Sequence, residues 1–69
     1  MPISGVKAIR ILEKNGFKLA RQKGSHVVMV KVRSESKTIA VIPKHKELKK
    51  GTIRSIARQS GISKSEFGL

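Results

Sequence analysis

The chain has no cysteine, no tryptophan and no tyrosine, and its only acidic residues are four glutamates. Without cysteine it has no disulfides and no thiolate metal site, so hydrophobic burial must hold a 69-residue domain together. His26 and His45 do not have the spacing of zinc ligands, and no glutamate completes such a motif. We therefore expect no metal and no other cofactor. The scarcity of aromatic residues argues against a protein that stacks single-stranded bases on aromatic rings.

Long apolar runs are also missing. Residues 27–30 are as long an apolar run as the chain contains, whereas a membrane-spanning helix needs about 18 apolar residues. Residues 1–5 lack the basic segment and the apolar stretch of a signal peptide. These absences predict a cytoplasmic protein with no membrane partner.

Positive charge is what the chain has in excess. Sixteen lysines and arginines give it a formal net charge of +12. Small soluble domains usually carry a net charge of about 2–8 in magnitude, so this excess indicates an anionic partner. Nucleic acid is the first candidate. A membrane surface is disfavoured because the bulky aromatics of an interfacial helix are absent, and an acidic protein partner is compatible with nucleic-acid binding.

The pattern of apolar residues predicts a helix, three strands and a second helix. The predicted ranges are a helix over residues 4–15, strands over residues 18–22, 25–32 and 38–42, and a helix from residue 50 or 51 to residue 60. Ser4 is the expected N-cap of the first helix, and Gly16 its expected end, with Phe17 folding back on it. Gly61 ends the second helix.

The connections are short. A tight turn is expected at residues 23–24 and a polar loop at residues 33–37, and Pro43 ends the third strand because proline cannot continue a ladder. A basic connection follows at residues 44–50. Residues 63–66 fit a capping box that starts a short helical turn including Phe67.

These elements predict an α+β fold in a single domain over residues 1–69. Short loops favour a three-stranded antiparallel sheet, and the two helices are expected on one of its faces. The same element order occurs in double-stranded-RNA-binding domains, which recognise A-form RNA mainly by shape and backbone contacts.

Residues 21–26, with the sequence Arg-Gln-Lys-Gly-Ser-His, combine the residue types that metal-independent RNA cleavage needs. That reaction requires a base for the 2′-hydroxyl, an acid for the leaving 5′-oxygen, and positive charge at the phosphate. His26 suits the proton transfers, and Arg21 and Lys23 suit the phosphate. Gly24 permits a sharp turn or a close approach of the backbone, and Ser25 offers a hydroxyl.

Both histidines also have structural interpretations. His26 shares a strand face with Val28, Val30 and Val32, so it is a half-buried structural histidine if that face is the core. Val27 and Met29 on the other face are apolar too, and alternation alone leaves the choice open. For His45 we favour a loop residue that positions the connection or contacts phosphate over a direct acid-base role.

A second group of basic residues follows the third strand and lines the second helix. It consists of Lys44, Lys46, Lys49, Lys50, Arg54 and Arg58. Arg54 and Arg58 are four residues apart and share a helix face. The group resembles the basic helix start that binds phosphates in RNA-binding domains. The alternative is an ordinary solvated face.

In this order the motifs resemble the HicA family of bacterial and archaeal toxins, over about residues 4–67. The matching segments are residues 16–17, 21–26, 41–43, 45–48, 51–52 and 56–62. The resemblance implies a double-stranded-RNA-binding-like fold and a translation-independent ribonuclease that cuts mRNA. It also implies that His26, in the Gly-Ser-His run, is catalytic, and that a HicB antitoxin covers the active site. Ser25, Lys23 and His45 are the candidates for the second proton-transfer group.

Two other functions stay open at this stage. One is a non-catalytic RNA-binding module of the same fold, in which His26 only contacts the RNA backbone. The other is an interaction protein whose basic surface meets an acidic partner.

Overall fold

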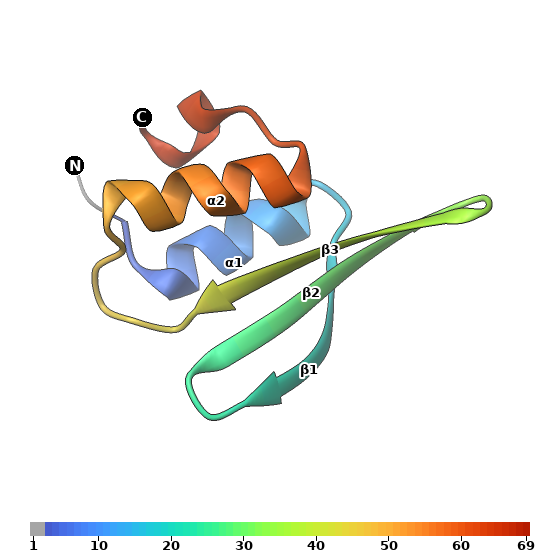
Figure 1. The fold of residues 1–69 in the computed structure, drawn as a ribbon, viewed down its shortest axis with the longest axis horizontal. Coiled ribbons are helices and arrows are strands. Elements are labelled where there is room, and N and C mark those ends of the chain that lie inside the picture. The colour runs from blue at the N-terminus through green and yellow to red at the C-terminus, as the bar shows by residue number, and fades with distance from the viewer. Residues whose placement is uncertain (1–2) are drawn as a thin grey trace.

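A computed structural model describes residues 3–69 of the chain. Residues 1–2 lie outside this range. They belong both to the predicted domain and to the segment considered above for a signal peptide. The elements in order are α1 (Gly5–Lys14), β1 (Lys18–Lys23), β2 (His26–Arg33), β3 (Ser36–Pro43), α2 (Lys50–Ser60) and the 3-10 turn η1 (Lys64–Phe67). The strands form one antiparallel sheet in the order β1-β2-β3. Both helices lie on one side of it, which confirms the predicted α+β architecture (Figure 1).

The core lies between the helices and one face of the sheet. Along β2, Val27 and Met29 are 1% and 0% exposed, and Ala40 and Ile42 of β3 are fully buried beside them. The helices, the 3-10 turn and the segments that adjoin them supply the other members of this core, which are Ala8, Ile11, Leu12, Phe17, Leu48, Ile53, Ile56, Ala57, Ile62 and Phe67. The helices therefore cover the face of β2 that carries Val27 and Met29.

Helix α1 begins and ends as predicted. The Ser4 hydroxyl accepts a hydrogen bond of 3.0 Å from the Lys7 backbone N–H, which satisfies one of the free donors of the first turn. Gly16 has a φ of 90°, and the Phe17 backbone N–H donates to the Leu12 carbonyl at 3.0 Å. Phe17 is buried and closes the helix against the core.

The first and third strands are longer than predicted, and the second keeps its predicted length but is shifted by one residue. The third strand spans Ser36–Pro43 rather than residues 38–42, and the predicted loop at 33–37 shrinks to a two-residue turn, Ser34 and Glu35. Polar residues at the tip still pair through their backbones, so a polar stretch does not end the ladder. The resulting β2–β3 hairpin extends beyond the helices (Figure 1).

Pro43 is the last residue of β3 rather than its stop. The Val41 N–H points away from β2 and donates to the Gln59 side-chain oxygen at 3.0 Å. Pro43 lies two residues further on, so its nitrogen also faces the free edge, where no ladder bond is lost.

Helix α2 ends at Gly61 as predicted, whereas the predicted capping box of the following helical turn forms only in part. Gly61 has a φ of 75°, and its N–H donates to the Ala57 carbonyl at 2.9 Å. Ser63 caps η1 by accepting from the Ser65 N–H. Glu66 instead accepts a hydrogen bond of 3.3 Å from the Asn15 side chain, so it links the 3-10 turn to α1.

Candidate functional site

The turn between β1 and β2 differs by one residue from the prediction. Lys23 is the last residue of β1 and pairs with His26, which leaves Gly24 and Ser25 as the two turn residues. Gly24 has a φ of 59°, a conformation that favours glycine. A Cβ there would meet no described atom within 4 Å. Glycine is therefore favoured by the positive φ of this residue and not by a lack of room for a side chain. The Gln22 side-chain amide donates to the Gly24 carbonyl at 3.2 Å and braces the turn.

His26 is exposed on the open face of the sheet. Because Val27 and Met29 face the core, His26, one residue earlier, faces the opposite side. Packing in the core therefore does not explain this histidine, and the half-buried structural interpretation is wrong. The side chain is held by a strand end and is accessible to a large ligand.

The ends of the two outer strands lie on either side of His26. Lys23 of β1 is its cross-strand partner on one side, and Pro43 of β3 is its partner on the other. The Lys44 N–H donates to the Ser25 carbonyl, with 2.6 Å between nitrogen and oxygen, and extends this pairing into the turn. The fold thus brings residues 20 positions apart in sequence to the same corner of the sheet.

Arg21 adds a second cation to the open face. It pairs with Val28 and lies two residues from Lys23 on the same strand, so both side chains belong to the face of His26. A β-bulge between Leu19 and Arg21 precedes these two residues in β1. We refer to Arg21, Lys23, Ser25, His26 and Lys44 as the sheet-end cluster.

His45 holds the connection through its backbone, and its side chain is exposed. Its carbonyl accepts a hydrogen bond of 2.8 Å from the Gly5 N–H at the start of α1. A Cβ at Gly5 would collide with the Pro43 carbonyl oxygen and lie 2.8 Å from the Lys44 Cα. The close approach of α1 therefore fixes the segment that flanks the sheet-end cluster.

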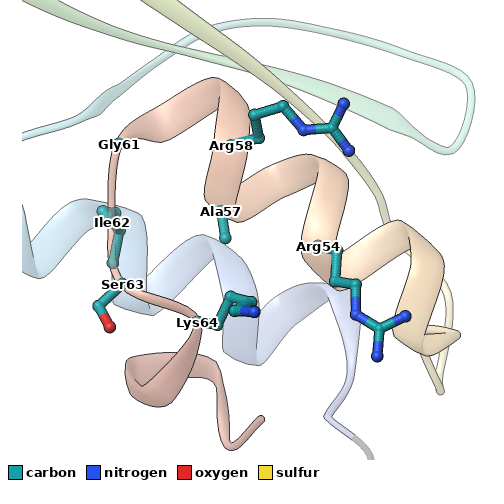
Figure 2. Close-up of a pocket in the computed structure, with 7 residues that line it drawn as sticks. All are labelled: Arg54, Ala57, Arg58, Gly61, Ile62, Ser63 and Lys64. Carbon is teal, nitrogen blue, oxygen red and sulfur yellow. The ribbon is translucent and has the colours of Figure 1, made fainter.

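The remaining predicted basic residues do not all join this cluster. Lys46, Lys49 and Lys50 are exposed along the connection and at the start of α2. Arg54 and Arg58 project from α2, and together with residues 61–64 they line a hollow of about 540 Å³ (Figure 2). A second hollow of about 730 Å³ extends it past the start of α2. Within the described chain, neither hollow includes Ser25 or His26.

Lys64 was missed by the sequence predictions. It lines both hollows together with Arg54, and we refer to the two hollows as the α2–η1 groove. In the sequence Lys64 is separated from the basic residues of α2 by the end of that helix at Gly61. The packing of η1 against α2 brings Lys64 to the same hollow as Arg54 and Arg58 (Figure 2).

An apolar stripe on the open sheet face was also missed. Val28 and Val30 are half-buried, while Val32, Ile39 and Val41 are 71%, 51% and 40% exposed. Cross-strand pairs Val28–Val41 and Val30–Ile39 make the stripe continuous, and His26 lies at one end of it. Contiguous exposed apolar surface on a small domain indicates a site of contact with another molecule.

Residues 3–69 contain no group of three acidic, histidine or cysteine side chains able to hold a metal ion. In the same range, no helix has the length and hydropathy required to cross a membrane.

Residues 5–62 match the family model described as the HicA toxin of bacterial toxin-antitoxin systems. This match covers most of the chain and includes the sheet-end cluster and α2. Lys64 and the rest of η1 lie outside the matched residues. A search of curated protein sequences finds no match.

Proposed function

Because the chain belongs to the HicA toxin family, whose members act in toxin-antitoxin systems, we propose that it is an mRNA-cleaving endoribonuclease with His26 as catalytic acid or base. The observation that carries the proposal is the exposed position of His26 between Lys23 at the end of β1 and Pro43 at the end of β3, which Lys44 follows. A histidine there has no packing role, and it lies where a phosphodiester could reach both it and Lys23.

The proposed reaction is an intramolecular transesterification of the RNA backbone. A base removes the proton from the 2′-hydroxyl, the 2′-oxygen attacks phosphorus, and the bond from phosphorus to the 5′-oxygen breaks. An acid then protonates the leaving 5′-oxygen, so the products are a 2′,3′-cyclic phosphate and a 5′-hydroxyl. Histidine suits either proton transfer, and cations nearby stabilise the charge that develops on the phosphate.

Of the candidates for the second group, we favour Lys23. It is the cross-strand partner of His26 and lies on the same open face. Ser25 lies in the turn and its carbonyl is tied to Lys44, while the described contact of His45 is a backbone bond to α1. Lys23 therefore serves the phosphate or the leaving oxygen opposite His26.

Family membership also implies an antitoxin partner. We propose that a HicB-type antitoxin covers the open sheet face. The support is the apolar stripe formed by residues such as Val28 and Val41, which ends at His26. A protein seated on this stripe would bury apolar surface and block RNA from His26 in one step.

Induced expression of the wild type and of His26→Ala tests the function. Wild-type expression should arrest growth and degrade cellular RNA, and expression of the variant should do neither. The variant should still fold, because the removed side chain is exposed. Equal RNA degradation by both proteins would refute the role of His26. If neither degrades RNA but both bind it, the protein is a non-catalytic RNA-binding module. If neither binds RNA, the basic surface serves a protein partner.

A further inference from the structure

The α2–η1 groove has the features of a binding site for a polyanion. Its two hollows share Arg54 and Lys64 and are lined by further basic residues of α2 and the connection. The lining cations are Lys49, Lys50, Arg54, Arg58 and Lys64, and the lining also includes the acidic residue Glu47. We propose that this groove binds the phosphodiester backbone of the RNA substrate beyond the point of cleavage, with Lys64 as a phosphate-binding residue. This proposal rests on the proposed function, since it takes RNA as the substrate.

The arrangement of the two arginines supports phosphate as the ligand. Arg54 and Arg58 lie one helical turn apart and both line the hollow next to η1 (Figure 2). The guanidinium group is always charged and binds phosphate through paired N–H donors. Lys64, at the start of η1, lines the same hollow, so an anion there would meet cations from both elements.

The position of the groove supports one continuous ligand. Lys44 is bonded through its backbone to Ser25 in the sheet-end cluster. Exposed lysines then continue along the connection to Lys49, the N-cap of α2, which makes no side-chain capping bond within the described chain. The first turn of α2 thus adds its own positive field at the entrance of the groove. An RNA chain that passes His26 and follows these cations reaches Arg54 and Lys64, whereas a protein bound in the groove alone would make no use of this continuity.

Binding to RNA that cannot be cleaved tests the proposal separately from catalysis. We would measure the affinity of Arg54→Gln/Lys64→Gln for a single-stranded 2′-O-methyl RNA long enough to reach from His26 to the groove, and for a 2′-O-methyl dinucleotide. The matched control is Arg33→Gln/Lys37→Gln, which removes one arginine and one lysine from exposed positions at the far tip of the β2–β3 hairpin.

The groove variant should bind the long RNA at least about tenfold more weakly than the wild type, and the control less than about threefold more weakly. The slope of log affinity against log salt should fall by about 1.4, because each single-strand phosphate contact contributes about 0.7. Dinucleotide binding should be unchanged. If the double variant fails to fold, Lys64→Gln alone should lower the slope by about 0.7.

Several results would overturn the proposal. Equal losses in the groove variant and the control would show that only total charge matters. A loss for the dinucleotide as large as for the long RNA would place the effect at the sheet-end cluster. Unchanged RNA binding combined with loss of binding to a protein partner would assign the groove to that partner. Failure of the proposed function is seen separately, as lack of cleavage of unmodified RNA by the wild type.

Discussion

At the scale of single residues, Gly24 sets the geometry of the turn that carries Ser25 and leads to His26. Its φ of 59° costs an L-residue about 1–2 kcal/mol, although a side chain there would meet no described atom within 4 Å. We expect Gly24→Ala to lower the free energy of unfolding by about 1 kcal/mol, measured by urea denaturation. RNA cleavage should fall as well, because the turn positions His26, the proposed catalytic residue.

A synthetic protein with D-alanine at position 24 is the control. A D-residue adopts positive φ without strain, so this protein should be at least as stable as the wild type. If L- and D-alanine destabilise equally, space and not backbone conformation limits this position.

At the scale of elements, the start of α1 is locked to the connection that follows β3. A Cβ at Gly5 would collide with the Pro43 carbonyl, so Gly5→Ala must displace the helix and weaken its bond to His45. We expect a loss of about 1–3 kcal/mol in the free energy of unfolding. In a domain of this size that corresponds to a fall in Tm of about 4–8 °C per kcal/mol, measured by thermal unfolding.

Gly51→Ala is the matched comparison within α2. A side chain at Gly51 would meet no described atom within 4 Å, and alanine is the better helix former by up to about 1 kcal/mol. The same substitution should therefore raise the Tm at position 51 and lower it at position 5. Similar effects at both positions would mean that the close approach at Gly5 does not matter.

At the scale of the whole molecule, we expect the net charge of +12 to destabilise the fold and to strengthen the proposed RNA binding. The Debye length is about 30 Å at 0.01 M salt and about 8 Å at 0.15 M, and the radius of gyration, 11.1 Å, lies between them. Added salt in this range should screen repulsion within the fold and raise the Tm. It should also lower RNA affinity steeply, because phosphate contacts release counterions. An RNA affinity that does not depend on salt would contradict the basic-surface model.

The element order and most helix ends were predictable because local chemistry determines them. Ser4, Gly16 and Gly61 act through bonds and dihedral angles within their own turns, and the structure confirms all three. The hairpin between β2 and β3 was predicted too short, because backbone pairing with a neighbouring strand outweighs the polarity of residues such as Ser36 and Lys37.

The sequence by itself determined the type of fold, the charge and the residue types from which an RNA-cleaving site is proposed. It did not determine which face of β2 is buried, because Val27 and Met29 on one face are as apolar as Val28 and Val30 on the other. The docking of the helices decides that, and with it the exposure of His26. Packing of η1 against α2 likewise places Lys64 beside Arg54. These choices depend on contacts between segments far apart in the chain, which alternation and spacing within one segment do not encode.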